Sequence, residues 1–127
     1  MDINPYRFEA PFAAYEFATF QRKAGVRLVL ISTAWLRSEG ARDADEDDAD
    51  EEEEEEGMPS ELHLYWSMRL RPLLHTPCIV ALCNRTGTER GTAFAGQSCV
   101  MSLLEPTVLG KLGADHQGVL VVDAPTP

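Results

Sequence analysis

The stretch from Cys78 to Ser98, CIVALCNRTGTERGTAFAGQS, places the strongest constraint on what this chain can fold into. It begins with a short, continuous apolar run that ends at Cys83, passes through a polar segment containing Gly87 and Gly91, and becomes apolar again. This pattern predicts a strand, a loop and a second strand. Because the first run is continuous rather than alternating, we expect that strand to be covered on both faces. An ordinary sheet core followed by a surface loop would give the same pattern.

The flanking sequence extends this pattern into an α/β layered fold, with helical and strand patterns in alternation. We expect a strand end and loop up to Glu9, and the two helices are each delimited by a residue that favours a helix end, Gly25 and Pro72. Trp66, Leu70 and Leu73 mark an apolar stripe on the second helix, with Ser60 as its N-cap. The predicted helices are Ala10 to Ala24 and Glu61 to Leu74; the predicted strands are Val26 to Leu36, Cys78 to Asn84, Thr92 to Leu103 and Gly118 to Ala124, with a turn at Glu105 to Gly113. The Val26 to Leu36 strand is apolar on both faces, so we expect it to be buried between layers.

Negative charge is concentrated in one tract. The net charge is −10, but Asp43 to Glu56 contains 12 of the 21 acidic residues, which leaves 9 acidic against 11 basic residues elsewhere. The near-neutral remainder argues against a nucleic-acid partner, because phosphate binding requires a cationic surface. We predict one domain, residues 1–127, with a disordered acidic insertion at 38–59 that is either a solvated loop or a docking site for basic partners.

Cysteine and histidine usage argues against a disulfide framework or a metal site. The three cysteines, Cys78, Cys83 and Cys99, are odd in number and lie in apolar runs, so we expect buried thiols in a reducing compartment. The three histidines are scattered without carboxylates at a triad or metal spacing, and we expect them to be exposed or capping. With no signal segment at the start and no apolar run of membrane-spanning length, we expect no membrane partner and a cytoplasmic or nuclear location.

Two segments resemble the carbon-nitrogen hydrolase, or nitrilase, superfamily. CNRTGTERGTAFAGQS is similar to the stretch in which an Asn-Arg-x-Gly turn follows a strand and a Gly-x-Ser opens the next one. MDINPYRFEAP resembles the segment that directly follows the nucleophilic cysteine, with Asp2, Arg7, Phe8 and Glu9 in matching positions. The inserted Asn-Pro-Tyr, the later AWL and the YW pair are most similar to protein N-terminal amidases, which deamidate N-terminal asparagine and glutamine.

The resemblance implies the C-terminal portion of an α-β-β-α sandwich, and hydrolysis of a terminal side-chain amide to a carboxylate and ammonia without a cofactor. The superfamily uses a glutamate as general base, a lysine that stabilises the tetrahedral intermediate and a cysteine nucleophile. All three would lie upstream of Met1, so we expect this chain alone to be inactive. The alternative is a catalytically silent remnant that acts by binding, through its exposed sandwich surface or its acidic loop.

The same resemblance points to a substrate-binding wall of Asp2, Arg7, Glu9 and Trp35, for a peptide or protein N-terminus. A carboxylate there would recognise the substrate's free α-ammonium group, since a buried ammonium needs a charged partner. In the structural alternative, Arg7 pairs with Glu9 or another carboxylate to hold the loop, and Trp35 is a core or rim residue. We do not expect any of the three cysteines to replace the nucleophile, because burial in apolar strands raises a thiol pKa. Exposed sheet edges would favour association with other chains.

Overall fold

The computed structural model describes residues 2–37 and 60–125, and the acidic insertion predicted at 38–59 lies outside the described residues. The α-helices are α1 (Glu16–Lys23) and α2 (Glu61–Arg69), and short 3-10 turns span Tyr6–Phe8, Phe12–Ala14 and Arg71–Leu73. The strands are β1 (Leu28–Thr33), β2 (Ile79–Asn84), β3 (Thr88–Glu89), β4 (Thr92–Ala93), β5 (Cys99–Ser102) and β6 (Thr107–Lys111). Within these ranges, no helix has both the length and the apolar character needed to cross a membrane.

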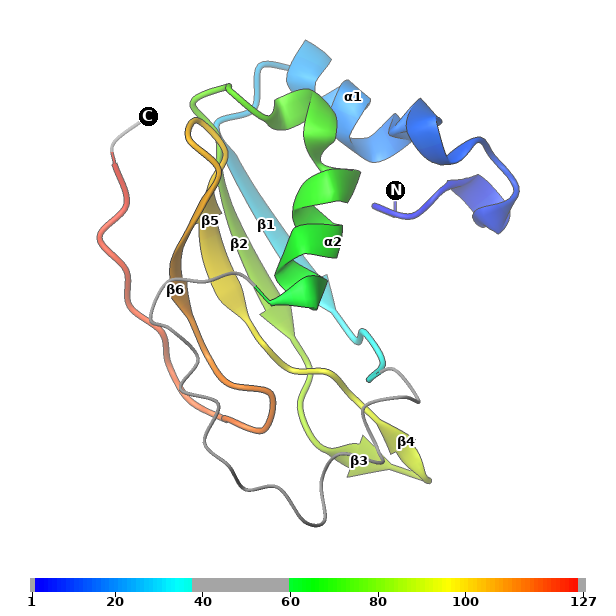
Figure 1. Ribbon diagram of the computed structural model, residues 1–127, viewed down its shortest axis with the longest axis vertical. Coiled ribbons are helices and arrows are strands. Elements are labelled where there is room, and N and C mark those ends of the chain that lie inside the picture. Colours follow the sequence, from blue (N-terminus) through cyan, green and yellow to red (C-terminus); the bar gives the residue numbers. More distant parts are fainter. Residues whose placement is uncertain (1, 38–59, 126–127) are drawn as a thin grey trace.

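A four-stranded sheet in the order β1-β2-β5-β6 forms the centre of the fold. β1 and β2 are parallel and connected through α2, while β2, β5 and β6 are antiparallel neighbours. Figure 1 shows both α-helices on one side of this sheet and the segment after β6 on the other. The separate β3-β4 hairpin lies beyond the carboxyl end of β2. This arrangement confirms the predicted α/β class.

The core lies between the sheet and the two helices. The sheet contributes side chains from alternate positions of neighbouring strands, and α2 and the turn after it contribute the predicted stripe, which is confirmed. The fully or almost fully buried members are Val29, Val80, Leu82, Cys99 and Met101 from the strands, Ala18 from α1, Trp66, Leu70 and Leu73, and from the connecting segments Ile3, Cys78 and Leu103. Because apolar burial is the main favourable term in folding, these contacts fix how α2 lies on β1 and β2.

The start of α2 is capped as the sequence predicts, with an unexpected partner. The Ser60 hydroxyl accepts a hydrogen bond from the His63 backbone N–H at 3.2 Å, and the Ser60 backbone N–H donates to His63 Nδ1 at 3.4 Å. His63 Nε2 lies 2.8 Å from the Gln97 carbonyl oxygen, and His63 is buried. His63 therefore caps the helix, but it is not exposed, because it also joins α2 to the loop before β5.

The segment before β1 differs from the prediction. The expected strand end before Glu9 is a 3-10 turn, and the expected helix from Ala10 is interrupted at Tyr15, so that α1 begins only at Glu16. Tyr15 has a left-handed backbone with φ 44°, and this conformation separates the 3-10 turn at Phe12–Ala14 from α1. The predicted stop is confirmed, since Gly25 adopts φ +69° directly after the helix.

The prediction that the strand at 26–36 is buried between layers is wrong for one of its faces. β1 is an edge strand, and Leu28 and Leu30 are 55% and 74% exposed, whereas Val29 faces the helices and is buried. The apolar pattern shows which residues could be buried, but a strand is buried on both faces only where another layer packs on each face of the sheet. Among the described residues, no layer lies over the Leu28 and Leu30 side of β1.

The C-terminal third also departs from the predicted elements. The strand expected from Thr92 to Leu103 is divided into β4 and β5, because Gly96 and Gln97 adopt left-handed φ values of 58° and 61° between them. The turn expected at 105–113 contains β6. The strand expected at 118–124 has no regular structure, and its alternating valines, Val119 and Val121, are 88% and 85% exposed. Leu120 and Val122 instead lie over Gly110 of β6.

Replacing the N-cap tests how much the capping arrangement contributes to stability. We expect Ser60→Ala to lower the free energy of unfolding by about 1 kcal/mol, because the His63 N–H loses its acceptor. Ser60→Asp is the matched control, since aspartate is an equally good N-cap. Chemical denaturation followed by far-UV circular dichroism measures both values. An equal loss in the two variants would mean that the hydroxyl acts through another contact.

Candidate functional site

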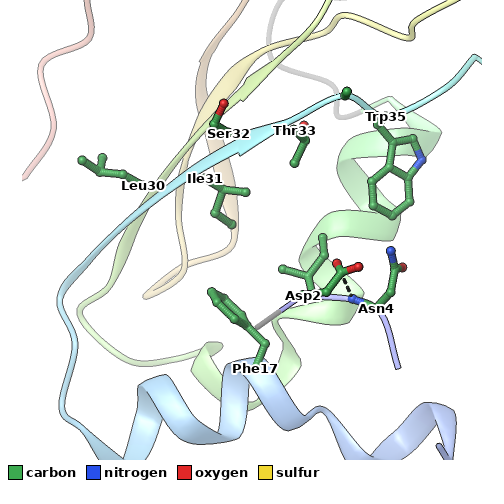
Figure 2. Close-up of a pocket in the computed structure, with 10 residues that line it drawn as sticks. Asp2, Asn4, Phe17, Leu30, Ile31, Ser32, Thr33 and Trp35 are labelled. Carbon is green, nitrogen blue, oxygen red and sulfur yellow. Dashed lines mark hydrogen bonds between the residues drawn. The ribbon is translucent and has the colours of Figure 1, made fainter. Parts of the chain in front are cut away.

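An open hollow of about 620 Å³ lies where the start of the chain meets the carboxyl half of β1. Figure 2 shows the side chains around it, with Asp2 and Asn4 facing Thr33 and Trp35 across the opening. Phe17 of α1 and Ile31 of β1 form its inner wall. Consecutive residues from Leu30 to Trp35 line the hollow, so it runs along the outer edge of β1.

The polar wall of the hollow is held by its own hydrogen bonds. Asp2 Oδ1 accepts a hydrogen bond from the Asn4 backbone N–H at 3.1 Å, which turns the chain sharply (Figure 2). The Tyr65 hydroxyl, from α2, donates to Asn4 Oδ1 at 3.2 Å. Asp2 is exposed, so its carboxylate is accessible to a ligand while the turn fixes its direction.

Trp35 closes the hollow at the end of β1. Its ring is half-buried and lies 5.4 Å from the Tyr65 ring and 6.3 Å, edge to face, from the Trp66 ring. Edge-to-face and tilted pairs at these distances stabilise aromatic packing. Trp35 therefore packs on the core and lines the hollow at once, so the two alternatives considered from the sequence are not exclusive.

The side chain of Asn84, at the end of β2, positions this part of β1. Asn84 Oδ1 accepts from the Trp35 backbone N–H at 2.7 Å and from the Thr33 hydroxyl at 2.8 Å. Its Nδ2 donates to the Gly96 carbonyl at 2.9 Å and to the Trp35 carbonyl at 3.4 Å. A buried amide can satisfy two acceptors and two donors in this way, which a carboxylate or an aliphatic side chain cannot.

Two further residues of the Asn-Arg-x-Gly and Gly-x-Ser stretch, Ser98 and Gly96, support the same loop. The Ser98 hydroxyl accepts from the Asn84 backbone N–H at 2.9 Å and donates to the Asn84 carbonyl at 3.3 Å. Gly96 has no room for a side chain, because a Cβ atom there would lie 2.1 Å from the Ala114 carbonyl oxygen. This stretch therefore holds the loop behind Trp35, and none of these three residues lines the hollow.

Arg7 and Glu9 lie outside the hollow. Both are exposed, and the Arg7 guanidinium lies 5.2 Å from the centre of the Tyr6 ring. The expected pairing of Arg7 with Glu9 is not formed; the ion pairs within the described part of the chain are Arg37–Asp115 and Arg85–Glu89. The structure thus brings Asp2 and Trp35 together and leaves the other two predicted residues apart. Their role in binding substrate stays a prediction.

The thiols occupy other parts of the sheet. Cys78 and Cys99 are buried as expected, and burial raises the pKa of both; that of Cys99 rises to about 12, with the nearby Cys83 as a smaller cause. Cys83 is exposed, which corrects the prediction for this residue: it lies on the opposite face of the sheet from Trp66 and lines a different hollow with Ala81 and Val100. No cysteine is among the described residues that line the Asp2 and Trp35 hollow.

A second hollow, of about 490 Å³, shares the Trp35 ring. Tyr65, whose hydroxyl donates to Asn4 of the first hollow, lines this second one. Its other polar groups include Glu61 and the Arg37–Asp115 ion pair at 2.9 Å. Trp35 therefore lies between two adjoining depressions, each open to solvent.

Together these features define an α/β protein with a carboxylate, an amide and an aromatic ring around one opening at the edge of its sheet. Comparison with curated proteins shows what the chain is related to. It is 33% identical to a protein N-terminal amidase of Schizosaccharomyces pombe over an alignment of 137 positions, which covers 95% of this chain and 44% of the relative. It is 44% identical over 43 residues to a protein N-terminal amidase of Saccharomyces cerevisiae, covering 34% of this chain and 9% of that relative.

These two matches show a relationship to protein N-terminal amidases, in agreement with the resemblance seen in the sequence. The chain spans less than half the length of the Schizosaccharomyces pombe relative. No protein-family profile matches the chain, and no solved structure does so either.

The four hydrogen bonds of the Asn84 side chain predict that this one amide contributes strongly to stability. We expect Asn84→Ala to lower the free energy of unfolding by about 2–4 kcal/mol, because several buried partners lose their hydrogen bonds at once. Thr33→Val removes only one of those partners without changing the shape, and we expect a loss of about 1 kcal/mol. Urea denaturation measures both. Similar losses in the two variants would show that Asn84 does not connect the three segments.

The burial of the thiols predicts their order of reaction. A pKa raised by burial keeps a thiol protonated, and therefore unreactive, at pH 8. We expect iodoacetamide at pH 8 to modify Cys83 in the folded protein, and to modify Cys78 and Cys99 only after denaturation. Peptide mapping by mass spectrometry gives the order. Modification of Cys99 in the folded chain as fast as Cys83 would contradict the burial described here.

Proposed function

We propose that this chain supplies the substrate-recognising part of a protein N-terminal amidase, an enzyme that hydrolyses the side-chain amide of an N-terminal asparagine or glutamine. The observation that carries the proposal is that the Asp2 carboxylate and the Trp35 ring line one open hollow. The relationship to protein N-terminal amidases supports it.

Each group of the hollow has a part in this proposal. Asp2 binds the α-ammonium group of the substrate's first residue, because an ammonium removed from water needs an anionic partner. The Asn4 side-chain amide accepts from Tyr65 through its oxygen and offers its nitrogen as a donor to the carbonyl oxygen of the substrate's side-chain amide. Trp35 packs against the aliphatic part of that side chain.

Hydrolysis needs a nucleophile in addition to this recognition. The reaction replaces the carboxamide nitrogen with an oxygen from water and releases ammonia. The thiols of residues 2–37 and 60–125 lie away from the hollow, and two of them have raised pKa values. We therefore propose that the 127-residue chain binds the substrate but does not hydrolyse it, and that the glutamate, lysine and cysteine implied by the resemblance come from outside this sequence.

A second function rests on the uncovered face of β1. Leu28 and Leu30 expose large apolar side chains on an edge strand, which favours association with another chain. In this alternative the chain is a catalytically silent binding protein. The unpaired thiols fit a reducing compartment, and for either function we propose a cytoplasmic or nuclear location.

Binding of a short peptide with N-terminal asparagine tests the first function. We expect the 127-residue chain to bind the free peptide at least 10-fold more tightly than its N-acetylated form. Asp2→Asn should weaken binding of the free peptide by about 10 to 100-fold and leave the acetylated peptide unchanged, because one charged hydrogen bond is lost. Isothermal titration calorimetry measures both affinities.

Glu9→Gln is the matched control, since it removes a carboxylate that lies on the same segment but outside the hollow. We expect it to bind like the parent chain. Ammonia assayed in the same samples should stay at the level of a buffer blank. Equal affinities of the parent chain for the two peptides would sink the first function, and ammonia release would refute the absence of hydrolysis.

A further inference from the structure

The segment from Asp2 to Tyr15 carries the polar wall of the hollow, yet it has little regular structure of its own. Two 3-10 turns are its only helical elements, and it contributes no strand. Arg7, Phe8 and Tyr15 adopt left-handed φ values of 53°, 55° and 44°. This backbone conformation is unfavourable for residues other than glycine. Strained conformations of this kind persist only where surrounding contacts determine them. The segment must therefore be fixed from outside.

Arg69, at the end of α2, makes the main contact with this segment. Its side chain is almost fully buried, with 1% exposure. Arg69 Nε donates to the Ile3 carbonyl at 2.9 Å, and Nη1 donates to the Phe12 carbonyl at 2.6 Å. The guanidinium carbon also lies 4.4 Å from the centre of the Phe12 ring and 5.2 Å from that of the Tyr15 ring. One side chain thus contacts both ends of the segment.

The surroundings of Arg69 are unusual for a buried cation. No ion pair described for residues 2–37 and 60–125 involves it. Its charge is balanced by two carbonyl dipoles and two aromatic faces, which attract a planar guanidinium. A buried charge is costly unless it is well paired, so the position of both carbonyls relative to α2 is tightly constrained.

The contact lies next to the hollow. Ile3, whose carbonyl Arg69 holds, is the residue between Asp2 and Asn4, which both line the opening. Tyr65 lies one helical turn before Arg69 on α2, and its hydroxyl donates to Asn4. One face of α2 therefore presents two donors, four residues apart, to the stretch that forms the polar wall.

We propose that Arg69 is a positioning residue for the substrate site: through the Ile3 and Phe12 carbonyls it holds Asp2 and Asn4 in the orientation that recognises the substrate's first residue. This inference rests on the proposed function for its ligand. Arg69 does not line the hollow, so it acts through the backbone of the segment rather than by touching substrate.

Arg69→Lys is the decisive variant, because lysine keeps the charge but lacks the planar fork that bonds two carbonyls at once. We expect its preference for the free over the acetylated peptide to fall at least 10-fold. Arg71→Lys is the matched control, since Arg71 is exposed two residues away, and it should keep the parent preference. Tyr65→Phe removes one neutral hydrogen bond and should reduce the preference about 2 to 5-fold, with a loss of about 1 kcal/mol in the free energy of unfolding that leaves the chain folded.

Hydrogen exchange separates this inference from the proposed function. In Arg69→Lys, the Phe8 and Ala14 amides, which close the two 3-10 turns, should exchange at least 10-fold faster than in the parent. The amide of Leu82, a buried residue of β2 between β1 and β5, should stay protected. Unchanged exchange at Phe8 and Ala14, or a full parent preference in Arg69→Lys, would overturn the positioning role.

Two other outcomes are also decisive. If the parent chain shows no preference between the peptides, the proposed function fails and the exchange rates alone decide the role of Arg69. If Arg69→Lys does not fold, Tyr65→Phe decides: a reduced preference in the folded variant supports positioning by α2, and a parent preference overturns it.

Discussion

The amide of Asn84 is the interaction on which the rest of the structure depends. Four hydrogen bonds from one buried side chain join the end of β1, the end of β2 and the loop at Gly96. Without this amide, Trp35 would lose the contacts that orient its backbone, and the hollow would lose its closed end. Asn84 does not line the hollow, yet its hydrogen bonds to Thr33 and Trp35 determine where these two lining residues lie.

Much of the framework could be predicted from the sequence because local signals and packing agree there. α2 has the expected N-cap and apolar stripe, but it ends at Arg69 rather than Leu74, and Pro72 lies in the 3-10 turn that follows. β2 is the expected strand. The segment before α1 could not be predicted, because its helical pattern competes with the left-handed conformation that tertiary contacts impose at Tyr15. The alternating valines at 119 and 121 resemble a strand, but strand formation needs a partner edge as well as a pattern.

The site shows the same division. Asp2 and Trp35 were predicted as site residues, and both line the hollow. Asn4, Tyr65 and Arg69 were missed as partners, because hydrogen bonds between residues more than sixty positions apart leave no periodic trace in a single sequence. The exposure of Cys83 was missed for a related reason: an apolar run does not show which of its faces remains uncovered.

The parallel pairing of β1 with β2 has a consequence for the order of folding. The last pair in that ladder, Thr33 and Asn84, is 51 positions apart in the chain, whereas β5 and β6 are consecutive and joined by a short turn. Pairs that are close in sequence lose less chain entropy when they meet, so they form sooner. We therefore expect the antiparallel strands β2, β5 and β6 to assemble first, and β1 to join them late. The hollow, which runs along β1, should accordingly be among the last parts of the molecule to form during folding.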